Sequence, residues 1–244
     1  VALAQYYFEN GAYEDVIAQT DQILAAYPDN QDAQFLLGMA YVQEGQTAVA
    51  IEPLSQFVEV RRQSPMASTD TVLETALYFL GTAYLEQSQP EEAISIFKEA
   101  LVINHTDADA MFQLGQAYTL TGQHDLAVEQ YHNAVRFVPD FTEAYQGMMA
   151  SYSAQNDTAH VAYARGMEAF SLKDYETART HLQSATESLT DFAPAYVGLG
   201  LALEQLGDYQ GAAASLEQAL AIDPENFMAS NALGRIQLLQ EKNS

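Results

Sequence analysis

The stretch ADAMFQLGQAYTLTGQHDLAVEQYHNAVRFVPDF, residues 108–141, contains two short segments whose apolar residues recur at helical spacing. Gly122 lies between the segments, where an unhindered backbone position ends a helix, and Pro139 follows the second segment, which it cannot extend. Helices this short are unstable alone, so each must bury its apolar face on a neighbour. The two faces consist of Met111, Leu114, Ala117 and Tyr118, and of Ala127, Val128, Tyr131, Ala134 and Val135.

The same register recurs along the chain, which predicts a repeat protein. Its members are Leu37-Gly38, Tyr41, Gly45, Ala50 and Phe57; Leu80-Gly81, Tyr84, Ala93, Phe97 and Ala100; and Leu199-Gly200, Gly207, Tyr209, Ala212, Leu216, Ala219 and Pro224. With Leu114-Gly115 in a unit of 34 residues, this pattern resembles the signature of the tetratricopeptide repeat family. The resemblance implies an all-α fold, a right-handed α-solenoid of antiparallel helix pairs, with about seven repeats and about fourteen helices. It also implies a binding scaffold rather than an enzyme.

The repeat period is interrupted twice. Residues 63–71 form an insertion, which delays the next Leu-Gly pair by nine residues. Near residues 156–158 the next unit begins after 17 residues instead of 34. Either the helix at 159–172 serves both as the second helix of repeat five and as the first of repeat six, or the groove changes side there. We therefore expect repeats one to five in residues 1–157, and repeats six and seven with a terminal helix in residues 158–244.

Charge is the unusual feature of the composition. The 244 residues include 33 acidic and 9 basic ones, for a net charge of −24. Such a surface repels phosphate backbones and anionic lipid, so we expect no nucleic acid partner and no direct membrane insertion. The acids serve either solubility or the attraction of a basic partner. Arg61 and Arg62, beside the insertion, are expected to pair with the protein's own carboxylates.

The chain contains no cysteine, which excludes disulfides and thiolate metal sites. Val1 falls within a helical pattern, which we interpret as a processed or trimmed chain. Asn104 and Asn156 each begin a glycosylation sequon, a pattern that also arises by chance. Together with the scarcity of lysine, the sequons favour an extracytoplasmic or secreted protein.

No catalytic pattern is present. The five histidines form neither a His-x-x-x-His pair nor a recognisable triad order, and we interpret them as surface or packing residues. The sequence also lacks a phosphate-binding glycine loop and a calcium loop. We therefore predict no enzymatic activity, no cofactor and no metal site.

In the family, the first helix of each repeat faces the concave groove. The corresponding positions here are mostly aromatic or methionine, which suits an apolar or amphipathic partner segment carrying basic residues. Family members that grip a terminal carboxylate use Lys, Arg and Asn at such positions, which this sequence lacks. The alternative is that these side chains pack on one another. The predicted partner-binding residues are Phe8, Phe35, Met39, Tyr78, Leu85, Phe112, Gln116, Tyr163, Met167, Phe170 and Leu201.

The sequence supports two functions. The first is an adaptor that takes up a protein or peptide segment in an aromatic groove rimmed by acids. The second is a building block that stacks head to tail into a filament through contact between residues 1–13 and 227–241. For that contact we expect the last helix to expose Leu233, Ile236 and Leu239.

Overall fold

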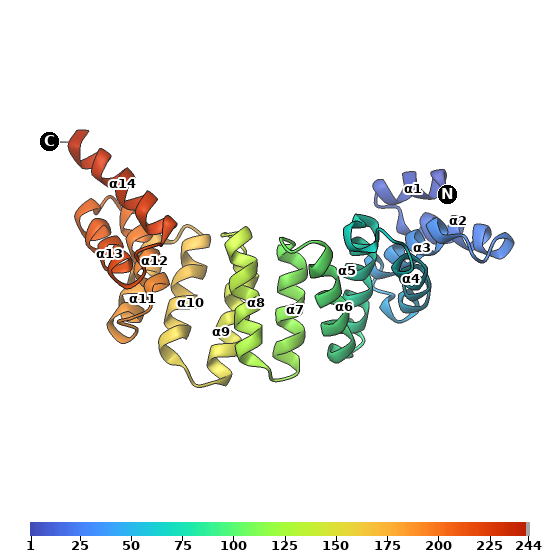
Figure 1. Ribbon diagram of the computed structural model, residues 1–244, viewed down its shortest axis with the longest axis horizontal. Helices are drawn as coiled ribbons and strands as arrows, with labels where there is room; N and C mark the ends of the chain where they lie inside the picture. Colours follow the sequence, from blue (N-terminus) through green and yellow to red (C-terminus); the bar gives the residue numbers. More distant parts are fainter. Residues whose placement is uncertain (243–244) are drawn as a thin grey trace. The chain divides into compact units, whose positions relative to one another are not determined.

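The computed structural model describes residues 1–242, which form fourteen α-helices and one 3-10 helix without any strand. The all-helical fold and the number of helices are as the sequence predicts. The chain divides into two compact units, Val1–Gln130 (unit 1) and Tyr131–Ser244 (unit 2). Within each unit, short connections make successive helices alternate in direction (Figure 1).

Unit 1 contains seven complete α-helices and the first part of an eighth. They are α1 (Ala2–Glu9), α2 (Tyr13–Ala26), α3 (Gln31–Gln43), α4 (Thr47–Arg62), α5 (Thr71–Glu86), α6 (Pro90–Ile103), α7 (Ala108–Leu120) and the start of α8 (His124–Phe137). A 3-10 helix, Ala67–Thr69, occupies the predicted insertion. There Arg61 pairs with Asp70, which caps α5, and Arg62 pairs with Glu99, so both arginines bind the protein's own acids as expected.

Unit 2 contains the end of α8 and six further helices. These are α9 (Thr142–Ala154), α10 (Thr158–Ser171), α11 (Tyr175–Ser188), α12 (Ala193–Gln205), α13 (Tyr209–Ile222) and α14 (Phe227–Lys242). Asp157, Asp174 and Asp208 cap α10, α11 and α13 by accepting a backbone N–H of the first turn. These caps fix where each helix begins.

Seven turns contain a residue in the left-handed backbone region, and their spacing reproduces the repeat period. These residues are Gly11, Gly45, Ser88, Gly122, Asn156, Lys173 and Gly207. Successive members are 34 residues apart, except for 43 residues between Gly45 and Ser88 and 17 between Asn156 and Lys173. The longer step contains the predicted insertion, and the shorter one is the predicted break.

In several helix pairs a glycine of the first helix meets a side chain 16 residues later on the second helix. A Cβ on Gly166 of α10 would lie 2.6 Å from Cγ of Leu182 on α11, and one on Gly38 of α3 would lie 2.4 Å from Cγ of Leu54 on α4. Only glycine permits this approach. Because α10 packs against both α9 and α11, it follows α9 while acting as the first helix of the next pair. Which of the two alternatives applies to the 17-residue step stays a prediction, because the other helices also pack against both of their neighbours.

Candidate partner-binding site

Four of the predicted partner-binding residues converge on one cavity in unit 2. The cavity has a volume of about 420 Å³ and is formed by α8, α9, α10, α12 and the residues at the start of α14. Tyr163, Met167 and Phe170 come from α10, and Leu201 comes from α12. Most of its other lining is also apolar, including Val135, Pro139, Pro194, Val197 and Met228. This composition and size are typical of a site that receives apolar side chains.

Helical spacing explains why three residues of α10 meet in the cavity. Tyr163, Met167 and Phe170 are separated by four and three residues and therefore share one face of the helix. Phe170 packs edge-on against Tyr175, with ring centroids 5.5 Å apart, which holds its ring in place. Met167 lies against Gly198 of α12, where a Cβ would approach its sulfur to 2.7 Å. The missing side chain at Gly198 therefore brings α12 close to α10.

Aromatic contacts hold the wall of the cavity around Tyr163. This buried ring stacks on His132 of α8 at 6.0 Å between centroids and meets Phe192 edge-on at 5.0 Å. Nε2 of His132 lies 3.3 Å from the Tyr152 hydroxyl. Burial, with a smaller contribution from His160, lowers the pKa of His132 to about 4. At neutral pH His132 therefore contributes a neutral ring to the cavity.

Two other polar groups at the cavity are already engaged within the protein. The Tyr145 hydroxyl donates to the carbonyl of Pro139 at 3.0 Å, and burial followed by the charge of Asp140 raises its pKa to about 12. Asn226 accepts the backbone N–H of Ala229 at 2.9 Å and thereby begins α14. These groups support the walls rather than offering free hydrogen-bonding capacity.

Sequence reasoning missed the contribution of α8 to the cavity. His132, Asn133, Val135 and Arg136 all line it. They were overlooked because α8 was interpreted as the second helix of its repeat, whose side chains would not face the groove. The signal that could have found them is the 17-residue step, since a single extra helix changes which of the later helices share a face with α8.

In unit 1, three of the predicted residues are committed to packing. Phe35 stacks on Phe57 at 4.7 Å between centroids, and Phe8 meets Tyr13 edge-on at 5.4 Å. Met39 is 5% exposed. These contacts favour mutual packing for this part of the predicted groove. Leu85, Phe112 and Gln116 are half-buried, and a binding role for them stays a prediction.

Tyr78 lies beside a cluster of acids in unit 1. Glu74 of α5 is close to Asp107, which caps α7, and burial followed by interaction with Asp107 raises the pKa of Glu74 to about 7. Burial and Asp107 also raise the pKa of Asp109, and the charges of Asp107 and Asp109 act on Tyr78. An aromatic side chain rimmed by carboxylates is therefore present here.

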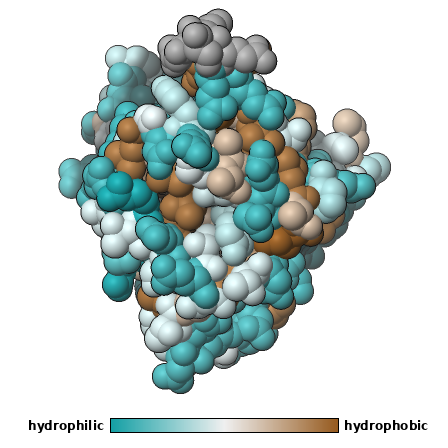
Figure 2. All heavy atoms as spheres, turned by 90° about the vertical axis from the view of Figure 1, so that its left-hand side faces the viewer, coloured by the Kyte–Doolittle hydropathy of each residue, from teal (hydrophilic) through white to brown (hydrophobic). Residues whose placement is uncertain are grey.

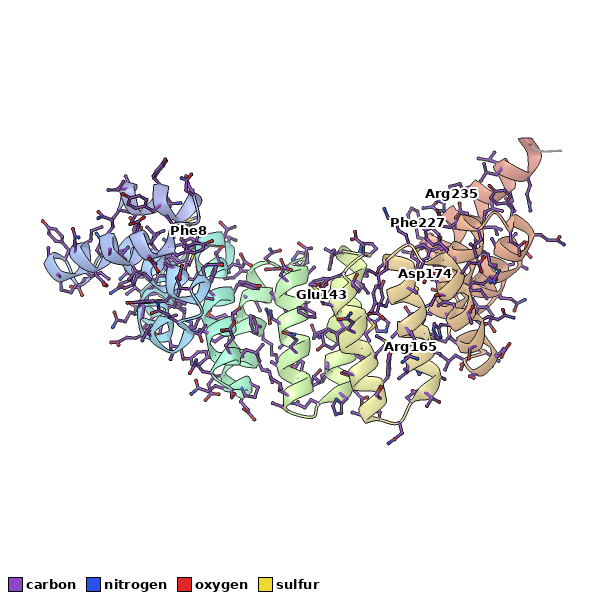
Figure 3. All side chains as sticks on the ribbon, turned by 180° about the vertical axis from the view of Figure 1, so that it is seen from behind. Phe8, Glu143, Arg165, Asp174, Phe227 and Arg235 are labelled. Carbon is purple, nitrogen blue, oxygen red and sulfur yellow. The ribbon has the colours of Figure 1, made fainter. Side chains whose placement is uncertain are left out.

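One of the three residues expected to be exposed on the terminal helix α14 is buried. Ile236 is 0% exposed because it packs in the core formed with α12 and α13, so the prediction that it is exposed was wrong. The apolar pattern of the sequence was misleading because one turn of α14 faces the internal core. Leu233 and Leu239 are half-buried. The exposed apolar residues of α14 are instead Phe227, at its start in Figure 3, Met228 and Leu238.

Apolar surface at this end of the chain is divided by hydrophilic residues rather than continuous (Figure 2). Self-association through Leu233, Ile236 and Leu239 stays a prediction, as do the expected domain limits. Of the two sequon asparagines, Asn156 is exposed, whereas Asn104 is half-buried and accepts the Thr106 hydroxyl at 2.9 Å. Whether either carries a glycan stays a prediction.

Two absences hold for the part of the chain that the structure describes, residues 1–242. No helix in this range is both long enough and apolar enough to cross a bilayer. No group of three or more His, Asp or Glu side chains among residues 1–240, whose side chains are described, is arranged to hold a metal ion.

An array of helical hairpins is the architecture of the helical-repeat proteins. Proteins of this class bind other proteins in their grooves. The chain belongs to the tetratricopeptide repeat family, whose sequence descriptions match residues 1–65, 163–227, 197–243 and 84–152. Proteins of this family are generally protein-interaction scaffolds.

Individual relatives share the repeats over part of their length. BBSome complex member bbs-4 of Caenorhabditis elegans is 27% identical over 165 residues, which cover 68% of this chain and 34% of that protein. The chain thus spans about a third of this relative. The crystal structure of MamA protein is similar at 26% identity and a TM-score of 0.55, over 75% of this chain and 90% of that one. A tetratricopeptide repeat protein from Parabacteroides merdae shares the fold over 97% of both chains, at 12% identity and a TM-score of 0.58.

Proposed function

We propose that this protein is a non-catalytic scaffold that binds a partner protein through an apolar segment carrying basic residues. The observation that carries the proposal is the cavity of unit 2, where Tyr163, Met167, Phe170 and Leu201 meet around about 420 Å³. Apolar side chains of the partner would fill this cavity and act as anchors. The relationship to bbs-4, which is named as a complex member, supports a role in a protein assembly.

The acids of unit 1 support the basic part of the proposal. Glu74, Asp107 and Asp109 gather beside Tyr78, and burial, followed by the hydrogen bond to Asp107 and the repulsion from it, raises the pKa of Glu74. A lysine or arginine of the partner would relieve that repulsion. The net charge of −24 would also speed the association of a basic partner at low salt.

The test uses a synthetic amphipathic peptide of leucine and lysine and protein labelled with ¹³C at the methionine methyl groups. Met167 and Met228 line the cavity, whereas Met66 is 70% exposed in unit 1 and serves as an internal reference. We expect the peptide to shift the Met167 and Met228 signals. Phe170→Ala should weaken binding about tenfold or more, as the loss of a central aromatic anchor does.

Leu172→Ala is the matched control, because Leu172 follows α10 directly, is 63% exposed and does not line the cavity. It should bind like the wild type. Unchanged Met167 and Met228 signals at saturating peptide, or equal affinity of the Phe170→Ala protein, would reject the cavity as the binding site.

A second candidate function is head-to-tail self-assembly, with glycosylated chains outside the cell. It is favoured by exposed apolar residues on both terminal helices, Leu3 and Tyr6 on α1 and Phe227 and Leu238 on α14. Light scattering across protein concentration tests it, since only this candidate predicts growing assemblies without a partner. Phe227→Glu should then prevent growth, whereas a charge introduced at Ile236 would disturb the internal core.

A further inference from the structure

We infer that the unit 2 cavity selects an apolar anchor flanked by a side-chain carboxylate, with Arg136 as the residue that recognises the acid. The inference rests on the proposed function, which supplies the apolar anchor. It assigns to this cavity a charge preference opposite to that of the acidic cluster in unit 1. The partner segment would therefore be basic as a whole but acidic beside this anchor.

The lining of the cavity is nearly free of charge. Among the residues that line the cavity, Arg136 carries the only charge, because His132 is neutral at pH 7 and no Asp, Glu or Lys takes part. Two acids lie behind the lining: the charge of Asp140 acts on Tyr145, and Asp223 accepts the side-chain amide of Asn226. Arg136 is therefore the charged side chain that the lining itself presents to a ligand.

The polar side chains of the lining differ in whether they have hydrogen-bond partners. His132, Tyr145 and Asn226 have partners within the protein. By contrast, neither Asn133 nor Arg136 forms a side-chain hydrogen bond or ion pair with a described side chain among residues 1–240. Their spacing of three residues places both side chains on one face of α8. An amide and a guanidinium are therefore available together beside the apolar walls.

The guanidinium of Arg136 lies against an aromatic ring. Cζ of Arg136 lies 5.4 Å from the centroid of the Phe137 ring, so one aromatic face supports it. Arg136 itself is exposed, and it therefore stands at the rim of the cavity rather than in its floor. A guanidinium held over an aromatic ring retains its N–H edges for a carboxylate, which it can bind through two parallel hydrogen bonds. An acid next to the buried anchor fits this arrangement.

The experiment compares three capped peptides, acetyl-Asp-Leu-Phe-amide, acetyl-Asn-Leu-Phe-amide and acetyl-Lys-Leu-Phe-amide. Their amide ends remove the terminal carboxylate, so only the first side chain differs in charge. Binding is followed through the methyl signals of Met167 and Met228. We expect the Asp peptide to bind about threefold more tightly than the Asn peptide, as a partly exposed ion pair permits, and the Lys peptide to bind most weakly.

Arg136→Gln should make the three affinities equal while preserving the response to the Asn peptide. Arg165→Gln is the matched control: Arg165 lies on α10 of the same unit (Figure 3), is exposed, and does not line the cavity. It should retain the wild-type order.

Two results would overturn the inference, and they are distinguishable. If all three peptides shift Met167 and Met228 with equal affinity in the wild type, the cavity binds anchors as proposed but Arg136 does not select among them. If none of the peptides shifts these signals, and the leucine-lysine peptide also fails to do so, the proposed function of the cavity fails and the inference fails with it. Loss of the acid preference in both arginine variants would assign it to general charge and would also reject the role of Arg136.

Discussion

Unit 1 contains 19 acidic and 3 basic residues, whereas unit 2 contains 14 and 6. The two units are built from the same repeat, yet they use their aromatic residues differently. In unit 1 Phe8, Phe35 and Met39 pack internally, and acids gather beside Tyr78. In unit 2 the equivalent residues surround a cavity with one arginine at its rim. A repeat fold therefore fixes the positions of side chains without fixing whether they pack on one another or line a cavity.

The largest expected effect concerns the cores and tests whether the units are independent. Leu54 in unit 1 and Leu182 in unit 2 are both 0% exposed, and each packs against a helix glycine. We expect Leu54→Ala and Leu182→Ala each to lower the free energy of unfolding by about 3 to 4 kcal/mol through lost contacts and a cavity. Urea denaturation, followed at Met111 in unit 1 and Met148 in unit 2, measures the effect.

If the repeats act through nearest neighbours, each substitution should shift mainly the transition of its own unit. Leu172→Ala, an exposed leucine, is the control and should change stability by less than about 0.5 kcal/mol. Equal shifts of the Met111 and Met148 transitions in both variants would show that the two units unfold as one.

The next effect is a pH dependence in unit 2. Burial lowers the pKa of His132 from 6.5 to about 4, so between these values the unfolded chain binds the proton and the folded chain does not. The stabilisation is therefore complete above about pH 6.5 and is lost as the pH falls toward 4, by about 2 to 3 kcal/mol. His132→Gln should flatten this dependence in urea denaturation from pH 4 to 7.

The control is His181→Gln, which removes a histidine of α11 that does not line the cavity. A wild-type profile that is already flat between pH 4 and 6.5 would contradict the buried neutral state of His132.

The smallest effect has the opposite sign and belongs to unit 1. Burial and Asp107 raise the pKa of Glu74 to about 7, so the folded chain holds a proton that the unfolded chain has released above about pH 4.5. The stability of unit 1 should therefore fall as the pH rises from about 4.5 to 7. Because Glu74 is only half-buried, solvent screening limits the change to roughly 1 kcal/mol.

Glu74→Gln should remove this decline, as measured at Met111, and Glu91→Gln at an exposed site of α6 should leave it intact. Taken together, the histidine and glutamate variants test whether acid weakens unit 2 while strengthening unit 1. A common direction of the pH response in both units would contradict the contrast.

The sequence predicted the fold through features that depend on local chemistry. Glycines at turns, Leu-Gly pairs and capping acids determine where helices begin, end and approach closely, which is why the insertion at 63–71 and the 17-residue step were found. Ile236 was misplaced because its burial depends on how α14 lies against α13, which periodicity alone does not specify.

The candidate site was predicted in part. Tyr163, Met167, Phe170 and Leu201 follow from the first-helix pattern, and the structure brings them together. Arg136 and His132 could not be found in the same way, because their contribution depends on the side of α8 that faces the cavity. For His132 the missing information was the burial among Tyr152 and Tyr163, which turns an ordinary histidine into a neutral packing residue.

The step of 17 residues between the left-handed turns at Asn156 and Lys173 bears on how such a chain can grow. Because α10 packs against α9 before it and α11 after it, one helix can be added to or lost from the array without leaving an unpaired neighbour. The modular unit is then the single helix and not the pair. Adding an odd number of helices exchanges the first and second helix of every later pair. A helix face that packs internally in one arrangement then lines the groove in the next.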